Sequence, residues 1–238
     1  MSEVLQLGDL AIELIQKDIK NVHLSVHPPH GRVRIAVPKN MTRERVRVFA
    51  ISKLAWIRQQ QKKLREQARE SRREYSERES HYVWGKRYLL TILEKNEPPK
   101  IELLHRKLRM TVRPVTDEVQ RAALLEGWYR ELIRQRAPDF IERWQKQLGV
   151  EHSKFFVRRM KTRWGSCNPV RRTIRLNTDL AKKPIECLEY VIVHELMHLL
   201  EPTHNARFVR LMNHHFPSWQ QCRNLLNRLP VRHEDWRV

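Results

Sequence analysis

The densest group of residues that could do chemistry is His194-Glu195-Leu196-Met197-His198, followed six residues later by His204. Two histidines four apart on a helix lie on one face, about one turn from each other, so both imidazoles can reach a single ion. A glutamate directly after the first histidine is placed to take a proton from water and pass it on. The pattern predicts one zinc ion held by His194, His198 and His204, with Glu195 as general base.

The number of ligands bears on whether such a zinc would be catalytic or structural. Three protein ligands leave a fourth position open for water or substrate, whereas structural zinc is normally closed by four. His214 and His215 are candidates for a fourth ligand. The helical pattern that runs from Asn205 through Met212 places them more simply at the end of a helix. The sequence therefore favours an open, catalytic site.

The elements that must position this motif can be read from the surrounding pattern. A helix that is apolar nearly all round begins near Pro184, carries Glu186 in its first turn and should be buried. Pro202 ends the pattern, so the chain must turn to bring His204 to the ion. Before the helix, residues 155–160 and 173–177 read as strands around a turn at 164–169. We expect these two strands to form an antiparallel pair.

The first half of the chain predicts further strands and helices. Residues 22–26 and 33–37 alternate around a Pro28-Pro29-His30-Gly31 turn, as in a β-hairpin, and Thr42 is placed to cap a following helix. Residues 82–93 and 101–112 read as strands, and 119–148 as a helix broken or kinked at Pro138 and capped by Gly149. The charged run up to residue 78 predicts a linker or projecting arm. These elements predict an α+β fold with a region of hairpin, basic helix and strands at 1–115 and a domain that carries the histidine motif at 116–238.

Composition and charge limit the class of protein. With 238 residues, 40% of them hydrophobic, the chain can bury a core, and no run approaches the length of a membrane helix. No signal-peptide pattern opens it and its three cysteines are far apart, so we expect a cytoplasmic protein with reduced thiols. The net charge of +20 is concentrated at 32–65, with eleven basic residues against one acidic, and at 152–178, with eight against none. Such surfaces attract nucleic acid, although a solvated basic face that aids solubility explains them equally well.

Three segments carry a resemblance to a known family. Residues 161–167 (KTRWGSC), 174–177 (IRLN) and the motif from His194 to His204, followed by Arg207-Phe208, resemble the YgjP-like metallopeptidases, relatives of the SprT-like and Wss1-like zinc proteases. The resemblance implies a zinc peptidase with a minimal zincin-like catalytic domain, in which antiparallel strands pack on the HExxH helix, acting on proteins or peptides. It carries zinc ligation onto the three histidines and the base role onto Glu195. Better-studied relatives act on proteins bound to DNA.

Residues around the motif are candidates for the substrate cleft. Tyr190, one turn before His194, and Arg163 are candidates to stabilise an oxyanion, and Trp164 and Cys167 to line the cleft. Packing in the core is the favoured explanation for Tyr190, because it lies on a buried helix, and a packed turn explains Trp164 equally well. An extended substrate would pair with a strand edge near residues 174–177.

Two other classes of protein fit part of this pattern. A metal-dependent nuclease fits the positive charge and the three-histidine spacing, which the bacterial ribosomal-RNA maturation endonucleases share. A nucleic-acid-binding protein with a structural zinc fits the charge alone. In those endonucleases a glycine follows the first histidine, so Glu195 favours the peptidase.

Overall fold

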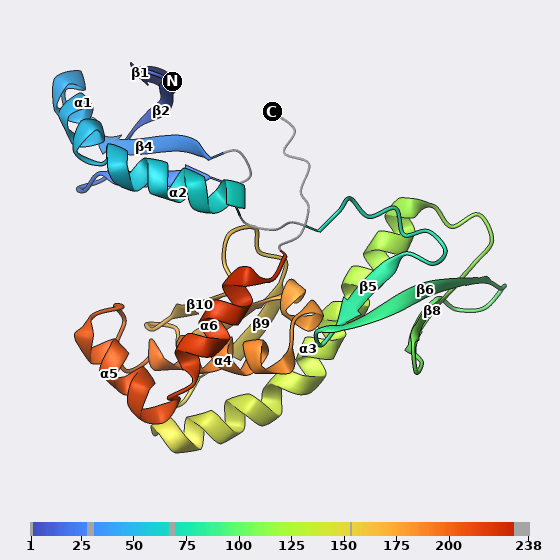
Figure 1. Ribbon diagram of the computed structural model, residues 1–238. Helices are drawn as coiled ribbons and strands as arrows, with labels where there is room; N and C mark the ends of the chain where they lie inside the picture. Colours follow the sequence, from blue (N-terminus) through green and yellow to red (C-terminus); the bar gives the residue numbers. More distant parts are fainter. Residues whose placement is uncertain (1, 28–30, 67–69, 153, 231–238) are drawn as a thin grey trace. The chain divides into compact units, whose positions relative to one another are not determined.

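The chain folds into two compact units that meet in sequence at Glu70 and Ser71. The computed structural model describes residues 2–27, 31–66, 70–152 and 154–230, so the predicted turn at residues 28–30 lies outside the described residues. Both units combine helices with small mixed sheets, as the predicted α+β class requires (Figure 1). The division falls earlier than the 115/116 boundary expected from sequence, because the strands between residues 80 and 112 share a core with the half that carries the histidine motif.

The N-terminal unit is a four-stranded sheet covered by two helices. Its strands are β1 (Ser2–Leu7), β2 (Leu10–Lys17), β3 (His23–His27) and β4 (Arg32–Pro38), in the order β1-β2-β4-β3. The predicted β3–β4 hairpin is confirmed, and β2 and β4 run parallel at the centre. Helices α1 (Arg43–Ser52) and α2 (Leu54–Glu66) follow, and the Thr42 side chain caps α1 as predicted. Ile12, Val33 and Ile35 from the sheet meet Val46 and Ile57 from the helices in a separate core.

The larger unit opens with a second sheet of the same design. Its strands are β5 (Ser80–Val83), β6 (Lys86–Glu94), β7 (Lys100–Leu103) and β8 (Lys107–Val112), in the order β5-β6-β8-β7. Sequence analysis predicted two strands here, and the first of these predictions is wrong because a turn at Trp84-Gly85 divides the run into a hairpin. Gly85 has a φ of +78°, which favours glycine. The second run divides in the same way between Leu103 and Lys107.

Helix α3 (Glu118–Leu148) connects this sheet to the half that carries the histidine motif. Asp117 and Gln120 form a reciprocal capping box at its start, and Gly149 closes it with a left-handed φ of 64°, which confirms the predicted cap. The helix continues through Pro138 and changes direction along its length (Figure 1). The proline therefore does not break it.

The three-stranded sheet before the histidine motif differs from the prediction in strand direction. Its strands are β9 (Lys154–Arg158), β10 (Gly165–Asn168) and β11 (Thr173–Asn177), in the order β10-β11-β9. The predicted antiparallel pairing of residues 155–160 with 173–177 is wrong: β9 and β11 are parallel. The segment predicted as a turn contains β10, which is the antiparallel partner of β11. This inserted strand reverses the chain once more, so β11 runs in the direction of β9.

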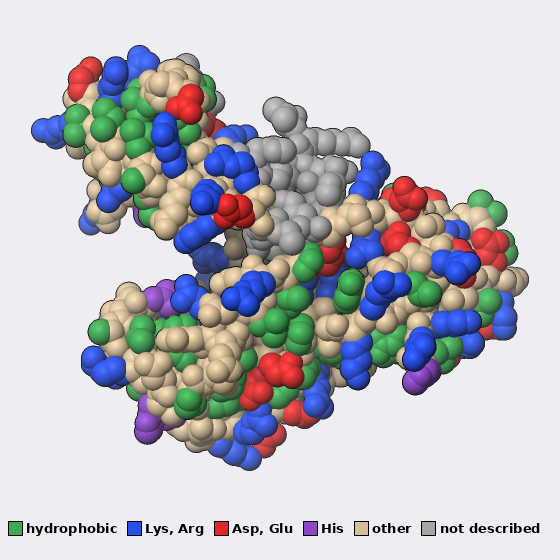
Figure 2. Space-filling model, viewed as in Figure 1, with side chains coloured by type: hydrophobic (Ala, Val, Ile, Leu, Met, Phe, Trp, Pro, Cys, Tyr) green, Lys and Arg blue, Asp and Glu red, His purple; other side chains and the backbone are tan. Residues whose placement is uncertain are grey.

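The remaining elements complete the larger unit. A 3-10 helix, η1 (Thr178–Lys182), leads into α4 (Ile185–Met197), whose start at Pro184 confirms the prediction. Helices α5 (Ala206–His215) and α6 (Trp219–Arg228) follow. Lys and Arg side chains are spread over the visible surface of each unit (Figure 2). None of the helices that the structure describes has the length and apolarity needed to cross a membrane.

Candidate active site

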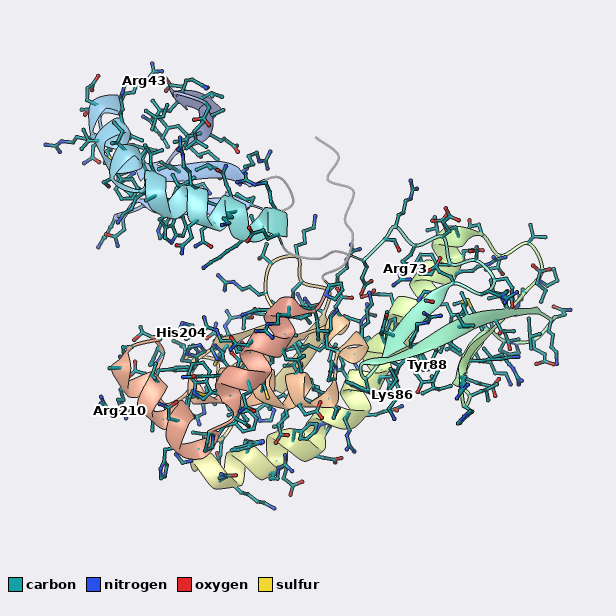
Figure 3. All side chains as sticks on the ribbon, viewed as in Figure 1. Arg43, Arg73, Lys86, Tyr88, His204 and Arg210 are labelled. Carbon is teal, nitrogen blue, oxygen red and sulfur yellow. The ribbon has the colours of Figure 1, made fainter. Side chains whose placement is uncertain are left out.

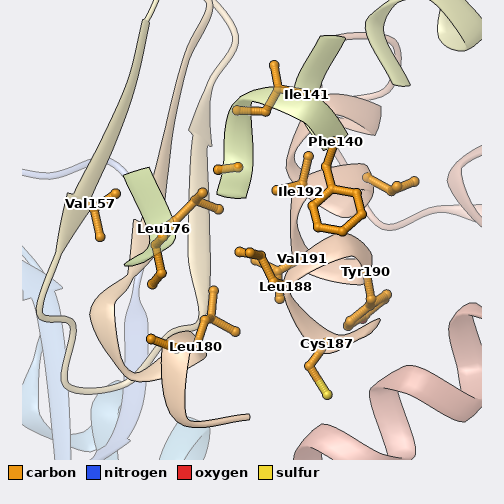
Figure 4. Packing of buried hydrophobic residues seen from close by; sticks show 14 of the residues in the cluster. Phe140, Ile141, Val157, Leu176, Leu180, Cys187, Leu188, Tyr190, Val191 and Ile192 are labelled. Carbon is orange, nitrogen blue, oxygen red and sulfur yellow. The ribbon is translucent and has the colours of Figure 1, made fainter. Parts of the chain in front are cut away.

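Helix α4 positions three of the four motif residues. Its Leu188, Ile192 and Leu196 are fully buried, and Figure 4 shows Leu188 and Val191 gathered with Val157 and Leu176 from the neighbouring strands. Burial of this face fixes the rotation of the helix, and with it the direction of the polar residues on the other face. His194 and Glu195 lie in the last turn, and His198 follows directly as the C-cap residue with helical φ and ψ.

A tight turn after α4 brings the third histidine back. The carboxylate of Glu201 accepts hydrogen bonds from the Thr203 backbone N–H at 3.3 Å and the Thr203 hydroxyl at 3.0 Å. Asn205 then caps α5 by accepting from the Phe208 N–H at 3.0 Å. His204 therefore lies immediately before α5, between two locally hydrogen-bonded positions (Figure 3).

The three imidazoles converge. One ring nitrogen from each of His194, His198 and His204 lies within 4.8 Å of the others, and Nε2 of His204 is 2.9 Å from Nε2 of His194. Among the described residues this is the one group of three or more His, Cys, Asp or Glu side chains with such spacing. His214 and His215 lie at the end of α5, stacked edge to face on each other, and are not part of it.

Phe208 of α5 forms a common support for these rings. Its centroid lies 5.0 Å from that of His194 and 4.9 Å from those of His198 and His204. Phe208 is 2% exposed, so α5 is anchored at the histidines themselves. Sequence analysis placed Phe208 in a helical stripe without seeing this role, because nothing in its spacing links it to three rings at once.

Hydrogen bonding and burial suit these imidazoles to a metal. His198 Nδ1 lies 3.0 Å from the carbonyl oxygen of Glu201, an acceptor, so Nδ1 carries the proton and Nε2 keeps its lone pair. Burial, reinforced by the charges of His198 and His204, lowers the pKa of His194 to about 3. Burial also lowers the pKa of His204. Neutral imidazole is the form that binds a metal ion.

Glu195 lies beneath strand β10, where glycine is required. A Cβ atom on Gly165 would lie 2.6 Å from Glu195 Oε1 and 2.8 Å from Val191 Cγ1, closer than real Cβ contacts occur. Only glycine therefore lets β10 approach α4 at this point. Glu195 is only 5% exposed, and this burial raises the pKa of its carboxyl group to about 8 because it disfavours the charged form. The positive charge of Arg163 opposes this rise.

A cleft of about 570 Å³ contains these groups. Arg163, Trp164, Cys167 and Tyr190, the four further residues predicted from sequence, all line it together with the histidines and Glu195. Burial raises the pKa of Cys167 to about 11, so its thiol is protonated and poorly nucleophilic. Burial raises the pKa of Tyr190 to about 12, so its hydroxyl remains a hydrogen-bond donor.

One wall of the cleft comes from a helix that sequence analysis did not connect to the site. Arg223, Leu226 and Asn227 of α6 line the cleft. They are spaced i, i+3 and i+4 and so share one helix face. The segment is 19 residues past His204, and only tertiary packing brings it back, so no local spacing could have identified it.

The cluster of three imidazoles is suited to hold a metal ion, and comparison with known protein families assigns the chain to a metallopeptidase family. The family described as "YgjP-like, metallopeptidase domain" matches residues 20–229, and the chain belongs to this family. No curated protein matches the chain. Two solved structures are similar to part of it, both of them metallopeptidase zymogens, at 22% sequence identity: abylysin of Pyrococcus abyssi and jannalysin of Methanocaldococcus jannaschii. The first covers 40% of this chain and 98% of its own (TM-score 0.35), the second 37% and 82% (TM-score 0.32).

Proposed function

We propose that this protein is a zinc-dependent metallopeptidase with a zincin-like catalytic domain, in which His194, His198 and His204 hold the ion. The observation that carries the proposal is the convergence of three imidazoles beside a buried carboxyl group in one cleft. A bound zinc ion supplies Lewis acidity, which polarises a peptide carbonyl and makes water reactive near neutral pH. The proposed catalytic residues all fall within the 116–238 region predicted from sequence, and the sheet of residues 80–112 supports it.

Glu195 is the proposed general base. Its carboxylate takes a proton from the attacking water while the water oxygen bonds to the carbonyl carbon, and it gives the proton to the amine as the C–N bond breaks. The close approach of β10 keeps this carboxylate away from bulk water. Arg163 and the Tyr190 hydroxyl line the same cleft and are the proposed donors to the developing oxyanion, while Trp164 and Cys167 form part of its wall.

The edge strand β10 is the proposed substrate-binding strand. The edge predicted near residues 174–177 is wrong, because β11 is the central strand and pairs with β9 and β10 on its two sides. Strand β10 is at the edge of the described sheet, and its Gly165, Ser166 and Cys167 line the cleft. An extended peptide would add to that edge through backbone hydrogen bonds.

Replacing Glu195 tests the catalytic assignment. Glu195→Gln is expected to keep one zinc per chain and to lower cleavage of an unfolded protein by at least about 100-fold, because general acid–base catalysis contributes that much or more. Glu186→Gln is the matched control, since Glu186 lies in the first turn of the same helix and does not line the cleft. Normal cleavage by Glu195→Gln would exclude Glu195 as the base. RNA cleavage that survives the substitution would favour a nuclease, and loss of folding on chelation without hydrolysis of any substrate would favour a structural zinc.

Proteins associated with nucleic acid are the proposed substrates. Helices α1 and α2 of the N-terminal unit carry seven Lys and Arg residues against Glu44 and Glu66, and Trp56 is 42% exposed on α2. Cationic side chains beside an exposed aromatic ring suit a phosphate backbone with a stacked base. We expect single-stranded nucleic acid to bind with an affinity that falls steeply as salt rises. Replacing Arg45, Arg47 and Lys63 together by Gln should make the affinity depend less steeply on salt concentration. Replacing Arg43 and Arg58, which form ion pairs, should have a smaller effect. An affinity of the unmodified chain that does not change with salt would refute this partner.

A further inference from the structure

The proposed cleft has one cationic side chain, Arg223, that the proposed peptidase chemistry does not use. Arg163 and Arg223 are the cationic side chains among its lining residues, and Glu195 is the one carboxylate. Arg163 belongs to the segment before β10 and acts on Glu195, while Arg223 belongs to α6 and lies on another wall. The cleft therefore presents a positive charge that catalysis by Glu195 leaves unexplained.

Helix α6 is held so that Arg223 faces this cleft. Trp219, Cys222 and Leu226 are buried and anchor the helix in the core of the larger unit. The Arg223 guanidinium carbon lies 5.9 Å from the Trp219 ring centroid, a cation–π arrangement that orients the side chain without neutralising it. The anchoring places a rigidly supported arginine at the substrate side of the site.

Arg223 lines the same cleft as Tyr190, His194 and His204. In the part of the chain that the structure describes, Arg223 forms no ion pair, whereas Arg207 on the neighbouring helix pairs with Glu201 at 3.5 Å. The guanidinium of Arg223 is thus available to an anion that enters the cleft.

A carboxylate is the anion that a peptide would bring. The guanidinium group presents N–H donors in a planar fork that matches the two oxygens of a carboxylate. A cleft with low-dielectric walls also focuses the field of such a charge on what enters it. We propose that Arg223 binds a substrate carboxylate, so that this enzyme prefers peptides with an acidic group beside the bond to be cut. This inference rests on the peptidase function proposed above.

A peptide carboxylate has two sources, and matched peptides distinguish them. One set carries Glu, Gln or Lys at each position flanking the scissile bond with an amidated C-terminus, and a second set carries Gln with a free or an amidated C-terminus. For the zinc-loaded chain, kcat/KM should be about tenfold higher for the Glu than for the Gln peptide if the side chain is bound. The same ratio between free and amidated ends would instead assign the site to the terminal carboxylate. Equal values in both sets would overturn the proposal while leaving the peptidase function intact.

Substitution of Arg223 then ties the preference to this residue. Arg223→Gln should bring the acidic-to-neutral ratio close to one, and Arg223→Glu should favour the Lys peptide. Arg228→Gln is the matched control, because Arg228 lies on the same helix but does not line the cleft, and its ratios should equal those of the unmodified chain. A preference that survives in Arg223→Gln would overturn the assignment.

A binding measurement separates this inference from the proposed reaction. The anisotropy of fluorescein-labelled Glu and Gln peptides is measured with zinc-loaded Glu195→Gln, alone and combined with Arg223→Gln. Tighter binding of the Glu peptide, lost in the double variant, supports the carboxylate site even if the unmodified chain cleaves no peptide. Equal binding of the Glu and Gln peptides, together with equal binding of Gln peptides with free and amidated C-termini, overturns it whatever the cleavage result.

Discussion

The chain builds the same four-stranded sheet twice and uses it in two ways. In β1-β2-β4-β3 and in β5-β6-β8-β7, two antiparallel hairpins join through a parallel central pair, and helix follows the last strand. The first sheet closes with α1 and α2 into a core of its own, whereas the second shares one core with α3 and α4. Identical topology therefore does not determine whether a sheet forms a core of its own or shares one with the helix that carries the histidines.

The turn of the first hairpin in each sheet, at Gly8 between β1 and β2 and at Gly85 between β5 and β6, explains much of why only the second sheet packs against α4. Gly8 and Gly85 both have positive φ, +60° and +78°. A Cβ on Gly8 would meet nothing within 4 Å, whereas one on Gly85 would lie 2.9 Å from Pro184, directly before α4. Backbone hydrogen bonds from Trp84 and Gly85 to Ala181 and Lys182 attach this turn to η1. The second sheet is thus fastened to the start of the helix that carries the histidines.

Core truncation should affect the two sheets most strongly and independently. Ile12 and Leu90 are fully buried at corresponding positions of the central strand pairs. Ile12→Ala and Leu90→Ala should each cost about 2–5 kcal/mol, the usual loss for a deleted core side chain. Only Leu90→Ala should lower the temperature at which peptide cleavage is lost, as followed by activity after heating and by calorimetry. An equal loss of activity in Ile12→Ala would show that the two cores are not independent.

The glycine turns give the next largest contrast. Gly85→Ala should destabilise the larger unit by about 2–3 kcal/mol, because left-handed backbone strain adds to the overlap with Pro184. Gly8→Ala carries the strain alone and should cost about 1 kcal/mol. Urea unfolding of both variants measures the difference. Equal costs would mean that Pro184 moves away freely and that the turn does not fasten α4.

Acidification should destabilise each sheet through a histidine whose pKa burial lowers, His27 on β3 of the first sheet and His81 on β5 of the second. Burial lowers the pKa of His81 on β5 from 6.5 to about 4, so between these values the unfolded chain binds a proton that the folded chain refuses. Stability should therefore fall as pH drops from 6.5 toward 4, and less so in His81→Gln. Glu13 on β2 has its pKa lowered by the hydrogen bond from Arg34, so its contribution is present above pH 4.5 and is lost only below it. Urea unfolding of the metal-free chain at a series of pH values between 6.5 and 4 measures this fall in stability. If stability falls equally steeply with pH in His81→Gln, the assignment to His81 is contradicted.

The smallest contrast concerns the central parallel pairs. Arg34 on β4 donates to both carboxylate oxygens of the facing Glu13, at 3.0 and 3.2 Å, whereas Arg109 on β8 faces Thr91. Arg34→Gln should cost about 0.5–1 kcal/mol, since the pair is partly exposed. Arg109→Gln should change stability by less than about 0.5 kcal/mol. A larger loss in Arg109→Gln would show that this ion pair does not distinguish the sheets.

The sequence predicts the chemistry of this site better than the walls around it. His194 and His198 are related by helical periodicity, and His204 follows a proline-marked break, so local rules suffice to group them. Arg223 and Phe208 reach the site through packing of α6 and α5, which no spacing in the chain encodes.

Strand direction was the part of the fold that local patterns could not supply. Alternation of apolar and polar residues marks β9 and β11 as strands, but it is identical for parallel and antiparallel neighbours. The outcome depends on whether the segment between them adds a strand of its own. That segment contains Gly165, and because glycine is typical of turns the sequence predicts a turn where the structure has strand β10.

Gly165 also gives the cleft an unusual kind of fragility. Strand β10 lies close to α4 because Gly165 has no side chain. Even the methyl group of alanine at this position would overlap with side chains of α4. This methyl group would reach Glu195 and Val191 without changing any imidazole, any charge or any hydrogen-bonding group of the histidine cluster. We therefore expect Gly165→Ala to displace Glu195 or strand β10 while leaving the side chains of the histidine cluster unchanged.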